Sequence, residues 1–224
     1  MTTKNILSLA LLTSALAITA GCATSPNKSA EATETPDYVV RERNPDPAPA
    51  WALDFSKFKR EKDGKGYSYY LGESGPVDDR IAGCDVAELE AKTKIAQQIA
   101  ELITSKIATD KQGRLVIDPS NPNDPGMERA FEEQLAGKSI AFLSGVHEYG
   151  TYWERRDYSK SNGNSRIFEC SSVVVISNKD MQTAIRRASH HTEDAVQDPD
   201  ARAAVKEALK DVDQEFLSYQ PKSQ

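Results

Sequence analysis

The sequence predicts an α+β domain, in which an alanine-rich helix packs on a small antiparallel sheet and further helices follow at the C-terminus. The first observation is an apolar repeat at three- and four-residue steps over residues 86–108, which is typical of an amphipathic helix. The second is alternating polarity on both sides of "KSNGNS", which predicts a β-hairpin over residues 146–177. The third is the helical periodicity of the chain after residue 178.

Two short elements are expected before the long helix. In "WALDF", Trp51, Leu53 and Phe55 occupy alternate positions, which predicts a short strand or an edge packed on the core. The charged "REKDGKG" is expected to form a turn. The following "YSYYLGESG" is expected to form a strand that ends at Gly72 or Gly75.

The long helix is expected to begin at Val86, because Asp85 and Glu88 resemble a capping box with aspartate at the cap. A start near Pro76 is the alternative. The apolar side of the helix carries Ala87, Ala91, Ile95, Ile99, Leu102 and Ile103. Its alanines allow a close approach to a sheet, and Cys84 lies on or beside the same face.

The segment "DKQGRLVIDPSNPNDPG" is predicted to be a loop, with a helical stretch after it over residues 126–145. The loop offers Asp118, Asn123 and Asp124 as oxygen ligands. A calcium loop also needs a glycine at its sixth position, which is absent here, so we expect a proline-punctuated turn instead.

In the predicted hairpin, alternate side chains of each strand share a face. One face of the first strand carries His147, Tyr149, Thr151 and Trp153. One face of the second strand carries Phe168, Cys170, Ser172, Val174 and Ile176. If this second face is the one turned to the long helix, Cys170 points toward Cys84.

Two helices are expected at the C-terminus, over residues 178–191 and 201–219. The last one has an apolar stripe made of Ala204, Val205, Ala208, Leu209, Val212 and Phe216. We expect this stripe to pack on its own domain. The alternative is a helix that binds a partner or a second copy of the chain.

The chain begins with an apolar run from Ile6 to Ile18, preceded by Lys4. A helix needs roughly 20 apolar residues to cross a bilayer, so this run is too short for a stable span and is typical of a secretory leader. The following "TAGC" resembles the lipobox of bacterial lipoproteins, although Thr19 stands where that family usually has leucine. An ordinary signal peptide or a retained anchor is the alternative.

The lipobox resemblance implies a signal peptide over residues 1–21 and two or three acyl chains on Cys22. Two chains suffice for stable anchoring where one does not. Ala23 and Thr24 follow the cysteine in place of aspartate, which implies sorting to the outer membrane.

Residues 22–50 are predicted to form a disordered, proline-rich tether, because they are rich in proline and hold almost no bulky apolar residue. The expected organisation is therefore a signal peptide over 1–21, this tether, an α+β lipoprotein domain over 51–192, and a C-terminal helix and tail over 193–224. The net charge of −6 argues against nucleic acid as a partner and against electrostatic docking on anionic lipid.

The chain has three cysteines. If Cys22 carries lipid, Cys84 and Cys170 remain as a pair in an exported protein, where disulfides persist. We therefore predict a bridge between them. Two buried free thiols are the alternative.

Several short motifs together resemble a known family. They are "YYLGESG", the alanines Ala82, Ala87, Ala91 and Ala96, "IAQQIAELI" and "YWERRD" followed by "SRIFECSSVVVIS". Over residues 51–187 they resemble the twenty-kilodalton lipoprotein family of the bacterial envelope, which includes the flagellum-associated FlgP. The resemblance implies a helix on a small antiparallel sheet, outer-membrane association and no known enzymatic site. The long tether, the Asn/Pro-rich insert and the C-terminal helices depart from the family pattern.

The motifs of common enzymes are missing from the sequence. "GESG" supplies Ser74 without the spacing of a nucleophile elbow. Metal ligands on a helix need i, i+4 spacing, which the adjacent His190 and His191 lack, and His147 is expected to be an ordinary strand residue. Catalysis by Cys84 would need a reduced thiolate. We therefore expect neither an enzyme nor a cofactor or metal site.

The sequence as a whole favours a non-enzymatic lipoprotein of the outer membrane that faces the periplasm. It would be a structural or assembly component that contacts an envelope protein or other copies of itself, and flagellar association is one setting. The alternatives are a regulator of a cell-wall enzyme, a ligand- or glycan-binding module, and an envelope hydrolase whose site no common motif reveals. A glycan site would use exposed aromatic residues on one face, for which the candidates are Tyr149, Tyr152 and Trp153.

Overall fold

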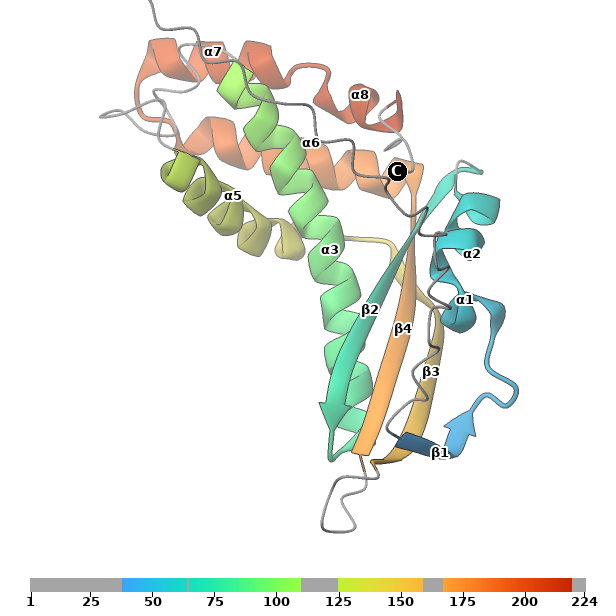
Figure 1. Ribbon diagram of the computed structural model, residues 1–224. Coiled ribbons are helices and arrows are strands. Elements are labelled where there is room, and N and C mark those ends of the chain that lie inside the picture. The colour runs from blue at the N-terminus through green and yellow to red at the C-terminus, as the bar shows by residue number, and fades with distance from the viewer. Residues whose placement is uncertain (1–37, 64, 110–124, 159–166, 219–224) are drawn as a thin grey trace, which may run out of the picture. The chain divides into compact units, whose positions relative to one another are not determined.

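A four-stranded antiparallel sheet in the order β1-β3-β4-β2 forms the centre of the fold (Figure 1). The strands are β1 (Tyr38–Asn44), β2 (Tyr67–Val77), β3 (Val146–Tyr158) and β4 (Ile167–Ser177). This computed structural model describes residues 38–63, 65–109, 125–158 and 167–218. The predicted α+β class is confirmed, and β3 pairs with β4 as the hairpin pattern requires.

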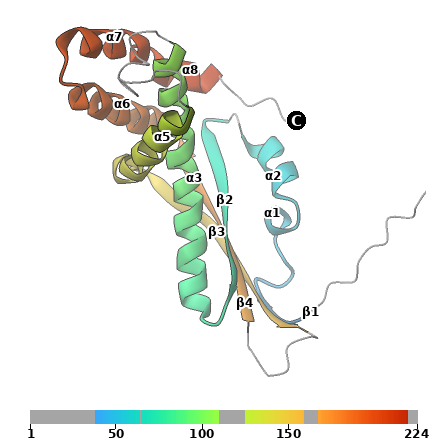
Figure 2. The same cartoon turned by 60° about the vertical axis from the view of Figure 1, so that its left-hand side comes forward.

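Helices lie on both faces of this sheet. They are α1 (Ala50–Leu53), α2 (Phe55–Lys62), α3 (Arg80–Thr109), α5 (Pro125–Ser139), α6 (Asn178–Ala195), α7 (Pro199–Leu209), α8 (Val212–Ser218) and the single 3-10 turn η1 (Ile140–Phe142). α3 covers one face, and α1 and α2 lie on the other (Figure 2). Along β4, Val174 and Ile176 enter the core beneath α3, whereas Val173 joins a smaller cluster with Trp51 and Phe58.

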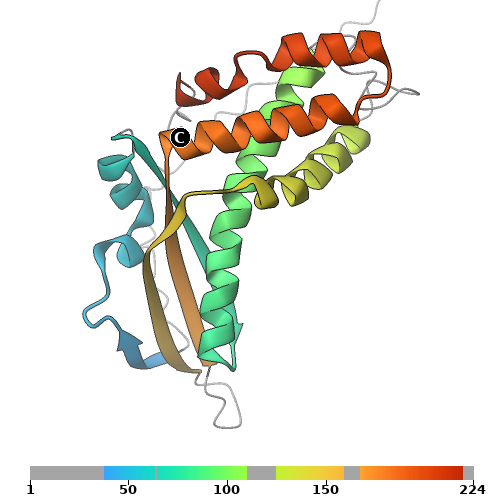
Figure 3. The same cartoon turned by 180° about the vertical axis from the view of Figure 1, so that it is seen from behind.

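The main core lies between the sheet, α3 and the helices that follow it. α5, α6, α7 and α8 gather around the C-terminal half of α3 (Figure 3). Its largest fully buried side chains include Ile95, Ile99, Ile103, Ile107, Ile176, Met181, Ile185, Val205 and Val212. The three- and four-residue spacing within each helix therefore turns one continuous apolar stripe inward.

The C-terminal stripe belongs to this core. Val205, Leu209, Val212 and Phe216 are all buried in it, so the expectation that the stripe packs on its own domain is confirmed. These side chains are not available as a self-association surface. The predicted single helix is instead two, α7 and α8, and the division placed at residue 192 falls inside α6 and separates no independent core.

The N-terminal boundary predicted for the folded domain is wrong. Part of the segment assigned to a disordered tether, Tyr38–Asn44, is strand β1 and pairs with β3. Its partners, from Trp153 to Tyr158, lie more than a hundred residues further along the chain. A strand that depends on such a distant partner has no local signal beyond its own short alternation.

The strand predicted at "WALDF" is also wrong, because this stretch forms α1 and the start of α2. Asp54 separates the two helices and caps the second, since its Oδ1 accepts a hydrogen bond from the backbone N–H of Lys57 at 2.9 Å. Trp51 is buried, whereas Leu53 is 75% exposed, so the alternation did not mark one buried face.

α3 begins at Arg80, six residues before the predicted start at Val86 and four residues after the alternative start at Pro76. Asp79 caps it by accepting hydrogen bonds from the backbone N–H groups of Ile81 (2.7 Å) and Ala82 (3.0 Å). Asp85, the predicted cap, lies inside the helix. The predicted leader, Cys22, the loop with Asp118, Asn123 and Asp124, and the hairpin turn lie outside the described residues.

Strand β2 is an edge of the sheet, and side chains of α3 form hydrogen bonds with two of its outward-facing backbone groups. The carbonyl of Leu71 accepts a hydrogen bond from Lys94 Nζ at 2.8 Å, and the N–H of Glu73 donates to Glu90. One turn apart on α3, Glu90 and Lys94 also form an ion pair at 3.1 Å. Burial would raise the pKa of Glu90, but these donors hold it below its usual value. An edge whose polar groups are already bonded is a poor template for another strand.

We expect the double variant Glu90→Ala/Lys94→Ala to self-associate, because it frees the outward groups of Leu71 and Glu73. Sedimentation should show dimers or larger species at concentrations at which the parent is a single species. The matched control is Glu88→Ala/Lys92→Ala, which removes an i, i+4 pair of the same helix (2.6 Å) that has no hydrogen bond to β2. If the two variants sediment equally, Glu90 and Lys94 do not protect the edge of β2 from pairing with another chain.

Candidate functional site

A hollow of about 320 Å³ lies beside the first turns of α3, where the helix meets β3 and the end of β1. Its lining residues are Asn44, Arg80, Ile81, Cys84, Asp85, Thr151 and Trp153. α3 packs mainly over β2 and β4, so the same face of β3 stays partly open next to the helix. The packing of one helix on a four-stranded sheet therefore produces this hollow.

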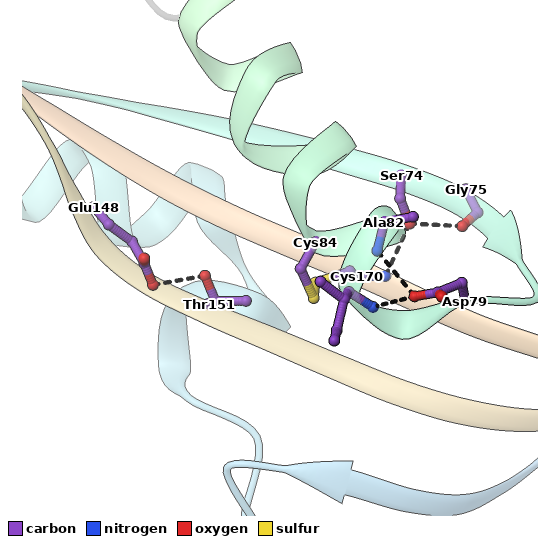
Figure 4. The surroundings of a disulfide bond; sticks show 9 residues. Ser74, Gly75, Asp79, Ala82, Cys84, Glu148, Thr151 and Cys170 are labelled. Atoms are coloured by element: carbon purple, nitrogen blue, oxygen red, sulfur yellow. Dashed lines mark hydrogen bonds between the residues drawn. A yellow bond between two sulfur atoms is a disulfide. The ribbon is translucent and has the colours of Figure 1, made fainter.

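A disulfide between Cys84 and Cys170 forms the junction of helix and sheet at this hollow (Figure 4). It joins α3 to β4 with a Cα–Cα distance of 5.0 Å and a sequence separation of 86 residues. Cys170 is buried, and Cys84 lines the hollow. The bridge predicted from the cysteine count and the strand face is therefore present, and the alternative of two free thiols is not observed.

The register of β2 changes next to this disulfide. The pairing with β4 shifts between Glu73 and Pro76, and Gly75 has a φ of +65°, a left-handed conformation that favours glycine. Ser74 Oγ accepts a hydrogen bond from the N–H of Cys170 at 3.0 Å and donates to the carbonyl of Gly75 at 2.7 Å (Figure 4). The role of Ser74 is therefore structural. Its hydroxyl bonds the backbone N–H of Cys170 where the pairing of β2 with β4 shifts.

The indole of Trp153 forms one wall of the hollow. The guanidinium of Arg80 lies 4.8 Å from its ring centroid, and Phe168 meets it edge-on at 6.0 Å. A cation above an indole face is attracted by the ring quadrupole. Arg80 therefore covers a face of Trp153 on which a sugar ring would otherwise stack.

The rest of the rim is a mixture of apolar and polar groups. Ile81 is 66% exposed. Asp85 lies one turn further along α3, and Thr151 Oγ1 donates to Glu148 at 2.7 Å on the opposite side (Figure 4). The rim thus combines an exposed aliphatic group with charges of both signs.

The three aromatic residues predicted to share a binding face do not share one. Trp153 faces the α3 side, whereas Tyr149 and Tyr152 lie on the opposite face. Tyr152 is 7% exposed and packs against Trp51, with ring centroids 6.5 Å apart. Tyr152 is the sequence neighbour of Trp153, so strand alternation alone puts the two on opposite faces. The pairing of β3 with β4 shifts between Glu148 and Gly150, and this irregularity separates Tyr149 from Trp153, which alternation had placed on one face.

Tyr152 instead belongs to a polar cluster on the face of the sheet opposite α3. It donates a hydrogen bond to Glu154, and Arg156 bridges Glu154 and Glu169, which lie directly opposite each other on β3 and β4. Burial, with the hydrogen bond and charge of Glu154, raises the pKa of Tyr152 to about 12. Burial would raise the pKa of Glu154, but Tyr152 and Arg156 hold it below its usual value. This cluster contributes stability at neutral pH, which is lost as the pH falls through that lowered pKa.

His147 on β3 is separate from the adjacent His190 and His191 on α6, and none of the three lines the hollow. His147 and His190 are exposed, and His191 packs near Phe142 with ring centroids 5.6 Å apart. Within the described ranges, no group of three or more histidine, cysteine, aspartate or glutamate side chains could hold a metal ion. The lining of the hollow, with an indole, an exposed aliphatic side chain and charges of both signs, suits contact with a surface of mixed polarity.

Arg80, Ile81 and Asn44 are lining residues that the sequence did not single out. The first two precede the predicted start of the helix, and Asn44 lies in the predicted tether. Asp79, a good N-cap residue directly before Arg80, was the signal that could have placed the first two on α3.

Comparison of the chain with protein-family models, with curated proteins and with solved structures finds no match. The resemblance to the twenty-kilodalton lipoprotein family therefore stays a prediction. None of the helices in the described part of the chain has the length and apolar character needed to cross a membrane.

Proposed function

We propose that this chain is a lipid-anchored lipoprotein of the bacterial envelope and acts without catalysis, as a structural or assembly component that contacts other proteins. The disulfide between Cys84 and Cys170 is the observation that carries the proposal. Such bonds persist in exported proteins and are rare in reducing compartments. The "TAGC" sequence at Cys22 supports a lipid anchor for the exported chain, and the absence of aspartate after it supports the outer membrane.

The surface proposed for protein contact is the rim of the hollow together with the exposed side of α3 next to it. Ile81, Asp85 and Leu89 follow one another at four-residue steps, so they lie along one side of the helix. Ile81 is 66% and Leu89 is 55% exposed. Exposed aliphatic groups beside an indole and charges of both signs are typical of a contact surface that is buried in a complex.

The glycan-binding alternative has less support from this geometry. Tyr149 and Tyr152 face away from Trp153, and Arg80 lies over the indole. A structural component or a regulator of a cell-wall enzyme would both use a contact surface of the kind described above. The family resemblance makes a flagellar assembly one setting for the first of these.

We expect a photo-crosslinking amino acid at Ile81 or Leu89 to capture a protein in intact cells. Both side chains are exposed, so the substitutions should leave the fold intact. The control position is Lys206, an exposed residue on α7. A charged variant, Ile81→Asp, should lower the yield of crosslinks from Leu89 roughly tenfold, as expected when one apolar anchor of an interface is lost.

Two results would contradict the proposed surface. One is the same set of crosslinked species from Ile81 and from Lys206. The other is an unchanged crosslink yield from Leu89 in the Ile81→Asp variant. Far-UV circular dichroism of that variant should match the parent and so separate a lost contact from a lost fold.

A further inference from the structure

The charge of the chain is unevenly distributed. The segment "FSKFKREKDGKGY", residues 55–67, contains five lysine or arginine residues and two acids, a net charge of +3. The whole chain has a net charge of −6, so the remainder carries −6 − 3 = −9. The negative total charge argued against docking on anionic lipid. Residues 55–67 nevertheless form a basic segment within this acidic chain.

The structure places this basic segment on α2 and the turn after it. Lys57, Arg60, Lys62 and Lys65 are exposed, and none of them forms an ion pair within the part of the chain that the structure describes. Lys59 differs, because it lies 3.8 Å from Asp63. Four cations are thus free to meet an anionic surface.

Exposed apolar and aromatic groups lie next to α2 in the chain or contact it: Leu53 ends α1, Tyr67 begins β2, and Tyr149 contacts Phe58 of α2. Tyr67 is 50%, Tyr149 44% and Leu53 75% exposed. Tyr149 is held in place, because its ring lies 5.2 Å from that of Phe58 and 5.4 Å from that of Tyr69. α1 and α2 lie on the face of the sheet opposite α3 (Figures 1 and 2). The hollow is lined by residues of α3 and therefore lies on the other face.

We propose that this surface, which we call the α2 face (Lys57, Arg60, Lys62 and Lys65 with Leu53, Tyr67 and Tyr149), docks on a bilayer surface that contains anionic phospholipid. Lysine and arginine near a membrane are attracted by anionic headgroups, and each contributes separately. Tyrosine is enriched at the membrane–water interface, where its ring and its hydroxyl meet different surroundings. Charge complementarity and the exposed tyrosines together favour a lipid surface over an acidic protein.

The inference deepens the proposed function, because it rests on anchoring at Cys22. Tyr38 is sixteen positions after Cys22, and a chain of sixteen steps can span at most about 53 Å at ~3.3 Å per residue. Strand β3, with 13 residues, is about 43 Å long at the same rise. Tyr38 pairs with the last residue of β3, whereas Tyr149 of the α2 face lies near its first residue. The segment between Cys22 and Tyr38 is nevertheless long enough for the α2 face to reach the membrane. Docking would leave the hollow, on the other face of the sheet, free to meet a partner.

The test uses the full chain, purified from membranes and reconstituted in nanodiscs of phosphatidylcholine alone or with phosphatidylglycerol. An environment-sensitive fluorophore is attached at Ser56→Cys, which is exposed on α2, or at Glu207→Cys, which is exposed on α7. We expect the Ser56 probe to shift to the blue and to be quenched by spin-labelled headgroups only in the anionic discs. The Glu207 probe should not respond. Half-molar salt should abolish the response, because it shortens the Debye length to a few ångströms.

The charge variant is Lys57→Gln/Arg60→Gln/Lys62→Gln/Lys65→Gln, which should lose roughly nine-tenths of the response. The matched control, Lys138→Gln/Lys179→Gln/Lys206→Gln/Lys210→Gln, removes the same charge from other exposed positions and should keep the probe response.

Equal probe signals in neutral and anionic discs, or equal loss in both variants, would overturn the proposal. So would a response to soluble polyglutamate in neutral discs without one to phosphatidylglycerol, because that result assigns an acidic protein partner. The mass of the N-terminal peptide tests the anchor separately, so failure of the lipid anchor and failure of docking are distinguishable.

Discussion

Replacing Gly72 by alanine is expected to lower the free energy of unfolding by about 3 kcal/mol, the upper part of the range for overpacked sites. A Cβ on Gly72 would overlap the carbonyl oxygen of Ala87 and lie 2.5 Å from the backbone nitrogen of Ala91. Both contacts are with the backbone of α3, which cannot turn aside as a side chain can. The helix would have to move away from β2 and loosen the core beneath it. Urea unfolding followed by circular dichroism measures this loss.

The control for this prediction is Gly137→Ala. Gly137 lies in α5, where an added Cβ would meet nothing within 4 Å. Alanine is favoured over glycine in a helix by up to about 1 kcal/mol, so this variant should be slightly more stable than the parent. A Gly72→Ala protein with the stability of the parent would show that the close packing of α3 on β2 does not hold in solution.

Loss of the disulfide is expected to cost about 4 to 5 kcal/mol of stability on the loop-entropy model. The bond closes a loop with a sequence separation of 86 residues, so it removes much conformational freedom from the unfolded chain. The variant Cys84→Ser/Cys170→Ala removes it while placing an apolar side chain at the buried position. Urea unfolding of this variant, of the oxidised parent and of the parent in dithiothreitol measures the effect.

The reduced parent serves as the control for the double variant, because it keeps both sulfur atoms in the fold. The two should have the same midpoint of unfolding, well below that of the oxidised parent. Cys84 lines the hollow, so the double variant should also give fewer crosslinks from Ile81. A reduced parent as stable as the oxidised one would refute the stabilising role of the bond.

Patterns that repeat within one element were sufficient to predict much of the main core. The spacing of Ala87, Ala91, Ile95 and Ile99 predicted the buried side of α3, and all four are fully buried. The alternation in β4 placed Cys170 on the same face as Val174 and Ile176, and that face does meet α3. These predictions were correct because helix and strand periods are properties of the local backbone.

The candidate site could be predicted only in part. Cys84, Trp153 and Thr151 were named from the sequence, but the structure groups them with Arg80 and Asn44. The expected aromatic face was wrong for two reasons. Tyr152 is the sequence neighbour of Trp153, so strand alternation puts the two on opposite faces, and an irregularity at Glu148 to Gly150 in β3 separates Tyr149 from Trp153. Such an irregularity is set by the pairing of two strands and cannot be read from either strand alone.

The sequence by itself determined the fold class, the helix that carries the core and the hairpin, because each of these rests on a local period. It predicted the pairing of Cys84 with Cys170, and the structure decided this against two free thiols. Only the tertiary structure decided that Tyr38–Asn44 is a strand, that Glu90 and Lys94 occupy the edge of β2, and that α2 gathers unpaired cations on one surface. Each of these depends on residues that are distant in the chain or on exposure, and both are fixed only when the elements pack together.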